Sequence, residues 1–208
     1  MKTIAGRITF IEEVLGTASN DKEIHSEYIA SKAPDAKSRE QEIEALGAEE
    51  VEKKEMTVFP RDADGNPILW DYQIKGFFKD ACGALRKANG SACSKVKAYK
   101  KEIDGLVFIK PREVRIVMPE GAEIGSCQRP LRAQTAQGER IALANSETVP
   151  AGSYCDIIIV LLKDDLEDMI KECLAYGKLR GIGQWRNSSK GRFIWETTKD
   201  TTKSDLLL

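Results

Sequence analysis

Alternation of apolar and polar residues predicts strands near both ends of the chain. In residues 3–10 the apolar side chains of Ile4, Ile8 and Phe10 alternate with threonine and arginine, as in a strand with one buried face. Residues 154–162 are almost continuously apolar and β-branched, which is typical of a central strand. We therefore expect these two segments to belong to the core sheet.

Helical spacing of apolar residues predicts two helices. The first covers residues 74–85, with apolar residues at positions 74, 77, 78, 81, 82 and 85 and basic residues on its other face. The second follows residue 164, where Asp164 is expected to cap a helix whose apolar face holds Leu166, Met169, Ile170, Cys173 and Leu174.

Shorter segments complete the pattern. Residues 106–110 and 114–118 are predicted as a hairpin, residues 192–195 as a last strand, and Asp64-Gly65 as a hairpin turn between apolar runs. The order strand, helix, two strands, helix, strand is the split βαβ pattern, so we expect an α+β, ferredoxin-like (RRM-like) core.

One domain over residues 1–208 is expected, with two additions. Residues 20–55 form an acidic insertion, either a solvated helical excursion or a disordered segment. Residues 119–149 hold several arginines among polar residues and are predicted as extended structure or a basic hairpin arm. The last residues, 199–208, are expected to be a frayed tail.

Charge is separated along the chain although the formal net charge is only −1. Residues 75–101 carry eight Lys or Arg against the single Asp80, whereas residues 21–55 carry eleven acidic residues against six basic ones. This composition excludes a uniformly basic nucleic-acid coat, so phosphate binding has to come from the basic segment. Complementary acidic and basic faces also predict head-to-tail homo-oligomers.

Five widely spaced cysteines fit neither a disulfide framework nor a zinc site, and predict reduced, mostly buried thiols. The chain shows no apolar run of membrane-spanning length and no signal-peptide core, which favours a cytoplasmic protein without membrane contact. Carboxylate pairs such as Asp62/Asp64 and Asp164/Asp165 are interpreted as turn and cap residues, so no metal or cofactor is expected.

Glycine and basic residues come together in residues 177–192. Gly177, Gly181, Gly183 and Gly191 permit positive φ and exposed N–H groups, while Lys178, Arg180, Arg186, Lys190 and Arg192 add charge with no acidic residue between them. The segment is interpreted as an anion-binding loop, and an ordinary solvated basic turn is the alternative.

Three segments resemble, in order, motifs of the RAMP superfamily, the ferredoxin-like subunits that form the guide-RNA backbone of CRISPR effector complexes. DGNPILWDYQIKG (64–76) resembles the G-x-P-x-I-P-x-S-S-x-K-G entry to the first helix, and ETVPAGS (147–153) resembles E-x-V-P-x-G. GIGQWRNSSKG (181–191) resembles the C-terminal glycine-rich loop. Asp71-Tyr72-Gln73 departs from the first motif, and Gln184-Trp185 from the third.

The resemblance implies a protein that holds the RNA backbone without strong sequence preference, alone or with other effector subunits, in antiviral defence or anti-defence. Trp185 either stacks on a base or anchors the loop by packing. The candidate RNA or nucleotide contacts are Lys75, Gly76, Lys79, Arg86, Lys178, Arg180, Gly181, Gly183, Trp185, Arg186, Lys190 and Arg192.

No catalytic residue can be assigned. His25 is the single histidine and is interpreted as a surface residue. The RNA-cleaving branch of the family has an aspartate between the first strand and the first helix; Asp21, Asp35 and Asp62 all fit by position. A non-enzymatic role is therefore favoured. Two alternatives stay open: sequestration of a small or cyclic nucleotide by a viral anti-defence protein, and a protein interaction or assembly module.

Overall fold

The computed structural model describes residues 1–20, 56–135 and 138–198, and the described chain divides into two compact units. The core unit comprises residues 1–14, 60–123 and the described residues from 149 onward, and the arm unit comprises residues 15–20, 56–59 and 124–148. The acidic insertion and the terminal tail predicted from the sequence lie outside the described residues. A single domain over residues 1–208 stays a prediction, because compactness does not decide whether each unit folds alone.

The core unit is built on a four-stranded antiparallel sheet. Its strands are β1 (Lys2–Phe10), β6 (Val107–Lys110), β10 (Tyr154–Leu161) and β11 (Phe193–Thr197), in the spatial order β11-β1-β10-β6. The first strand therefore lies between the third and the fourth strands of the split βαβ order. This arrangement confirms the predicted α+β, ferredoxin-like core.

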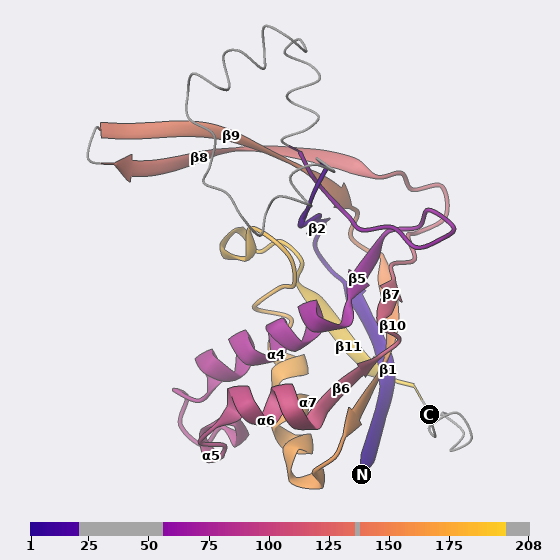
Figure 1. Ribbon diagram of the computed structural model, residues 1–208, viewed down its shortest axis with the longest axis vertical. Coiled ribbons are helices and arrows are strands. Elements are labelled where there is room, and N and C mark those ends of the chain that lie inside the picture. Colours follow the sequence, from indigo (N-terminus) through magenta and orange to yellow (C-terminus); the bar gives the residue numbers. More distant parts are fainter. Residues whose placement is uncertain (21–55, 136–137, 199–208) are drawn as a thin grey trace, which may run out of the picture. The chain divides into compact units, whose positions relative to one another are not determined.

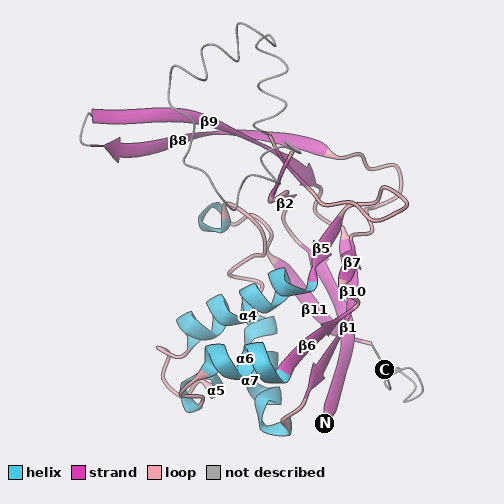
Figure 2. Ribbon diagram, viewed as in Figure 1, coloured by secondary structure: helices cyan, strands magenta, loops and turns pink. Residues whose placement is uncertain are grey.

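Two longer helices, α4 (Asp71–Leu85) and α7 (Glu167–Tyr176), lie together on one side of this sheet (Figure 1). Between α4 and β6 the chain forms two further helices, α5 (Ala92–Lys95) and α6 (Tyr99–Leu106) (Figure 2). The sequence pattern predicted neither, because each buries a single side chain, Cys93 in α5 and Ile103 in α6. Helix α6 also displaces the start of the predicted strand to Val107.

Aromatic and sulfur-containing side chains fill the space between the helices and the sheet. The rings of Phe77 and Phe193 meet edge to face with centroids 5.0 Å apart. The thiols of Cys93 and Cys173 lie 3.7 Å apart. All five cysteines are free thiols, and four of them are buried, as the sequence predicted.

One predicted hairpin, that of residues 106–110 with 114–118, is wrong in its pairing, and the turn predicted at Asp64-Gly65 is confirmed. Strand β7 (Glu113–Arg115) pairs with β5 (Ile68–Trp70), not with β6, which pairs with β10. The turn at Asp64-Gly65 is present and closes a bridge between Arg61 and Pro67. The short strands on its two sides, however, pair with different partners, because β4 (Thr57–Val58) belongs to the arm unit.

The predicted cap of the second helix is also wrong. Residues Asp164–Leu166 form a 3₁₀ turn ahead of α7, and the Asp164 carboxylate pairs with the N-terminal ammonium at 3.2 Å. The carboxylate therefore neutralises the chain terminus instead of accepting from the first turn of the helix. No helix among the described residues is long and apolar enough to cross a membrane.

The arm unit is a long antiparallel hairpin with short strands beside it. Strands β8 (Gly125–Thr135) and β9 (Gly138–Val149) pair from Gly125↔Thr148 to Thr135↔Gly138, and β2 (Val14–Leu15) and β4 lie along β9, with β3 (Ala18–Ser19) paired to β4. Arg129, expected on a basic surface, is buried, and its Nη1 donates to the Ser146 hydroxyl at 3.1 Å. Its charge is therefore directed into the arm.

Candidate nucleic-acid interface

The segment that departs from the family motif starts helix α4. The backbone N–H of Trp70 donates to Oε1 of Gln73 at 2.7 Å, and Asp71 places a carboxylate in the first turn, where the helix dipole favours negative charge. Asp71-Tyr72-Gln73 thus stabilises the N-terminus of the helix that carries the basic face. Gly76 faces open space, because a Cβ atom there would meet nothing within 4 Å.

The basic side chains of α4 contact α6 and the strand after it. Lys75 donates to the Asp104 carbonyl at 3.2 Å and lies 4.6 Å from the centre of the Phe108 ring. Lys79 pairs with the Asp104 carboxylate at 2.5 Å. Since these contacts leave the side chains partly exposed, the cations border the surface without being buried.

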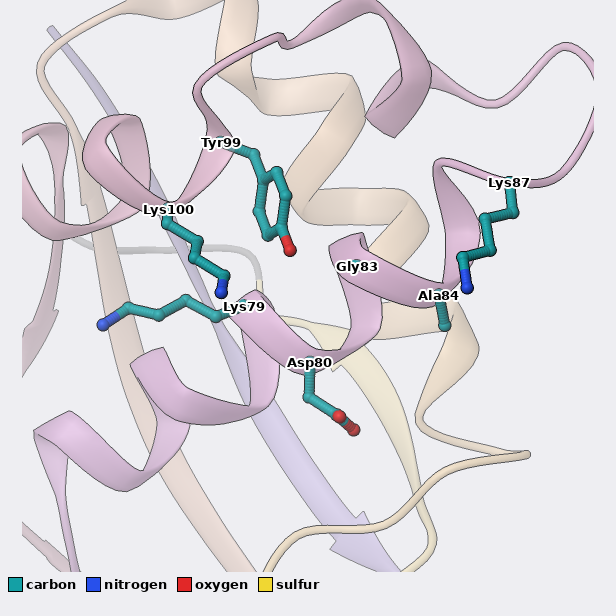
Figure 3. Close-up of a pocket in the computed structure, with 7 residues that line it drawn as sticks. All are labelled: Lys79, Asp80, Gly83, Ala84, Lys87, Tyr99 and Lys100. Atoms are coloured by element: carbon teal, nitrogen blue, oxygen red, sulfur yellow. The ribbon is translucent and has the colours of Figure 1, made fainter.

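A surface hollow of about 530 Å³ opens between α4 and α6 (Figure 3). In Figure 3 the Tyr99 hydroxyl points toward Gly83, where a Cβ atom would lie only 2.9 Å from it. The Arg86 guanidinium lies over the same Tyr99 ring, 5.3 Å from its centroid. The residues that line this α4–α6 hollow are Lys79, Asp80, Gly83, Ala84, Lys87, Tyr99 and Lys100.

Two of these lysines were not in the predicted site. Lys87 and Lys100 are exposed, and neither has an ion-pair partner among the residues that the structure describes. The sequence placed both in the basic segment, but only the packing of α6 against α4 brings Lys100 and Tyr99 beside Lys79. The sequence offered no periodic signal for that contact, because α6 was not predicted.

Two glycines of the loop between α7 and β11 allow its two backbone segments to pass very close to each other. A Cβ atom on Gly191 would lie 1.9 Å from the Ile182 carbonyl oxygen, and one on Gly181 would lie 2.1 Å from the Lys190 carbonyl oxygen. Gly191 also has a φ of +70°, and its N–H donates to the Glu13 carbonyl at 2.8 Å. Its N–H is therefore not available to an anion.

Most of the charge in this loop is paired, contrary to the expectation from the sequence. One oxygen of Asp80, on α4, accepts from Nε of Arg180 at 2.9 Å and from Nη1 of Arg186 at 2.8 Å. Lys190 pairs with Glu13, and Arg192 pairs with Glu12 at 2.8 Å. Lys178 is exposed and has no ion-pair partner among the described residues.

A second hollow, of about 420 Å³, lies on the loop itself and is called the loop hollow here. Trp185 is on its wall in the left-handed region, with φ 53° and ψ 35°, and 39% of its surface is exposed. For an L-residue this conformation costs about 1–2 kcal/mol. The lining residues are Arg180, Gly183, Gln184, Trp185, Arg186 and Asn187.

The remaining candidates do not join these hollows. His25, Asp21 and Asp35 lie outside the described residues. Asp62 accepts hydrogen bonds from the backbone and side chain of Asn66 at 2.8–3.0 Å, so it shapes the turn before α4. Within the described ranges, no group of histidine, cysteine and carboxylate side chains is placed to hold a metal ion.

Known protein structures share the fold of this chain. No known family profile matches the sequence, and no curated protein is similar to it in sequence. A chain of the "Type III-B Cmr-beta bound to cognate target RNA" superposes with a TM-score of 0.54 and 11% identity over 95% of this chain. Cmr6 from Pyrococcus furiosus superposes with a TM-score of 0.47 and 12% identity, over 94% of this chain and 98% of its own length.

The likeness bears on architecture. The present chain spans 58% of the length of the matched Cmr-beta chain. Because identity over the match is only 11%, the likeness shows a shared fold and not a shared set of side chains. The structural likeness therefore supports, at the level of the fold, the distant resemblance to the RAMP superfamily that the three sequence motifs indicated.

Proposed function

We propose that the protein binds RNA through its sugar-phosphate backbone, without strong sequence preference, on the surface formed by α4, α6 and the loop after α7. The observation that carries the proposal is the convergence of seven cationic side chains, from segments distant in sequence, around two carboxylates, Asp80 and Asp104. These cations are Lys75, Lys79, Arg86, Lys87, Lys100, Arg180 and Arg186.

The existing ion pairs leave this surface able to accept phosphates. The side chains of Asp80, Arg180 and Arg186 are each about one third exposed, between 29% and 35%. Exposed pairs of this kind contribute about 0–1 kcal/mol, so phosphate oxygens can replace the carboxylate at little cost. Lys87 and Lys100 supply further donors that no described carboxylate occupies.

Partners follow from the same proposal. The structural neighbour with the TM-score of 0.54 is described as bound to cognate target RNA. By analogy, the chain would bind RNA as one subunit among other effector subunits, or as a homo-oligomer that uses its acidic and basic segments. Size-exclusion chromatography at low and moderate salt separates these assemblies from a monomer.

The test is a triple charge reversal. Lys79→Glu, Lys87→Glu and Lys100→Glu together should weaken binding of single-stranded RNA in fluorescence anisotropy. They should also reduce the slope of log K against log salt by about 2, since each lost phosphate contact removes about 0.7. The matched control is Lys110→Glu, Lys163→Glu and Lys171→Glu, which changes the net charge of the core unit equally but leaves both hollows intact.

An equal loss of affinity in the two triple variants would show that only net charge matters and would reject this surface. A wild-type protein that binds no RNA at low salt would reject the proposal itself.

A small or cyclic nucleotide is the second candidate ligand. The α4–α6 hollow, at about 530 Å³, has the size of many small-molecule sites and is lined by three lysines. A nucleotide held there should bind with weak dependence on salt, whereas an RNA backbone should show steep dependence. If the protein purifies without nucleic acid and binds neither RNA nor nucleotide, a role as a protein interaction module would be favoured.

A further inference from the structure

The loop hollow has features that a phosphate site does not require. We propose that it holds one unstacked nucleobase of the bound strand, with the indole ring of Trp185 as the stacking surface. This inference rests on the proposed function and adds a base contact to a surface otherwise suited to the RNA backbone. Three features support the base site: the strain at Trp185, the ion pairs around its ring and the anchoring of the loop.

Trp185 is held in a strained conformation although much of its ring remains in solvent. Its φ is 53°, and a large aromatic residue in this region is an outlier where glycine or asparagine would fit without strain. A packing anchor would be buried, as Phe77 and Phe193 are at 2% and 0% exposure, whereas Trp185 is 39% exposed. Strain that is not offset by burial is found at functional sites.

The cations around the ring already have carboxylate partners. Arg180 and Arg186 share Asp80, and Lys190, whose ammonium lies 6.0 Å from the centre of the Trp185 ring, pairs with Glu13. The hollow thus offers an aromatic surface for an uncharged base, and the two arginines that share one carboxylate keep positive charge beside it. The flanking phosphates would lie toward these arginines and toward Lys87 and Lys100, which have no ion-pair partner among the described residues.

An amide group on the same wall, that of Asn187, can contact the edge of a base. Asn187 Oδ1 accepts from Nη1 of Arg180 at 2.8 Å, which fixes the orientation of that side chain. Its Nδ2 group donates to no described residue, so it can donate to a base oxygen or ring nitrogen.

The loop presents the ring on a fixed support. Ile182 N–H donates to the Gly191 carbonyl at 3.0 Å, which joins the two sides of the loop, and Ser188 N–H donates to the Trp185 carbonyl at 2.9 Å. Because the ring is already placed, a base that stacks on it loses little free energy to ordering of the protein.

The test compares Trp185→Asn with wild type on two ligands, an oligoadenylate and an abasic oligomer with the same number of phosphates. Asparagine tolerates the left-handed region, so the variant should fold with equal or higher Tm. We expect affinity for the oligoadenylate to fall at least about fivefold, and affinity for the abasic oligomer to stay unchanged. Leu179→Asn, on the same loop and 71% exposed, is the matched control and should change neither.

A second variant keeps the test decisive if Trp185→Asn does not fold. Trp185→Phe retains an aromatic ring, so it should retain most of the affinity while losing the quenching of indole fluorescence that RNA causes in wild type. Equal quenching in both proteins would overturn the base site.

The outcomes separate the two proposals. RNA binding that Trp185→Asn leaves unchanged would overturn the base site alone. Absence of binding to both oligomers in the wild-type protein would overturn the backbone proposal as well. Adenosine monophosphate binding as tightly as the oligomer, and lost in Trp185→Asn, would support the base site and overturn the RNA proposal in favour of nucleotide sequestration.

Discussion

Asp80 is the residue on which the charge of the candidate interface depends. A single oxygen of its carboxylate holds two arginines of the loop after α7, and the side chain also lines the α4–α6 hollow. The same residue therefore links the loop to helix α4 and lowers the positive potential that a phosphate would meet. These two roles predict opposite effects when the carboxylate is removed.

Replacing Asp80 with asparagine should strengthen RNA binding by about fivefold, because a unit charge about 4 Å away contributes about 1 kcal/mol in water. The free energy of unfolding should fall by about 1 kcal/mol or less, since both ion pairs are partly exposed. Anisotropy titrations and thermal melts measure the two effects. Asp165→Asn is the control, and weaker binding by Asp80→Asn than by wild type would contradict this view of the residue.

Alanine variants of Gly191 and Gly65 distinguish the cost of backbone strain from the cost of steric overlap. Both have positive φ, of +70° and +83°, but only at Gly191 would a Cβ atom meet backbone, 1.9 Å from the Ile182 carbonyl oxygen. Gly65→Ala should cost about 1 kcal/mol, the usual cost of alanine at positive φ. Gly191→Ala should lower the Tm considerably more. Equal Tm values for the two variants would show that the backbone at Gly191 can move away from Ile182 at little cost.

At the scale of elements, periodicity predicted the parts that bury a continuous face. Helix α4 and strands β1, β10 and β11 were found close to their predicted positions because each places apolar residues at a regular spacing against the core. Helix α6 carries only Ile103 as a buried residue, so its pattern gave no signal. The pairing of β7 with β5 was missed because local sequence favours adjacent strands, whereas tertiary packing selected a distant one.

The sequence showed that the loop after α7 is rich in basic residues, but it did not show that these residues have carboxylate partners. The loop after α7 contains no acidic residue, so its cations looked uncompensated. The fold brings Glu12 and Glu13 from the end of β1, and Asp80 from α4, against the loop. These partners lie a hundred or more residues away in the sequence, so no local pattern predicts the ion pairs. The close backbone contact that requires glycine at positions 181 and 191 could not be predicted for the same reason.

At the scale of the whole molecule, the accessibility of the five cysteines measures how tightly each unit is packed. Cys82, Cys93, Cys155 and Cys173 are fully buried in the core unit, and Cys127 in the arm unit is partly accessible. Burial raises the pKa of Cys155 to about 12, and hydrogen bonding with Cys82 and Cys93 together with burial raises the pKa of Cys173. Thiols with raised pKa stay protonated at neutral pH and react slowly.

A thiol-reactive chromophore should therefore label one of the five cysteines in the folded protein and all five in denaturant. Cys127→Ser should abolish the fast phase and leave the slow labelling unchanged. Raising the pH from 7 to 9 should not recruit Cys155, because both values lie below its pKa of about 12. Rapid labelling of two or more thiols at neutral pH would show that the helices α4, α5 and α7 separate readily.

The position of β1 has a consequence for the synthesis of the chain. This strand is the first element, yet its two neighbours in the sheet are β10 and β11, the last strands of the described chain. As the polypeptide leaves the ribosome, β1 has an apolar face and two unpaired edges until residues 154–197 have been made. Folding of the core unit is therefore largely a late event in translation, and a ribosome that stops before residue 154 leaves β1 without either sheet partner.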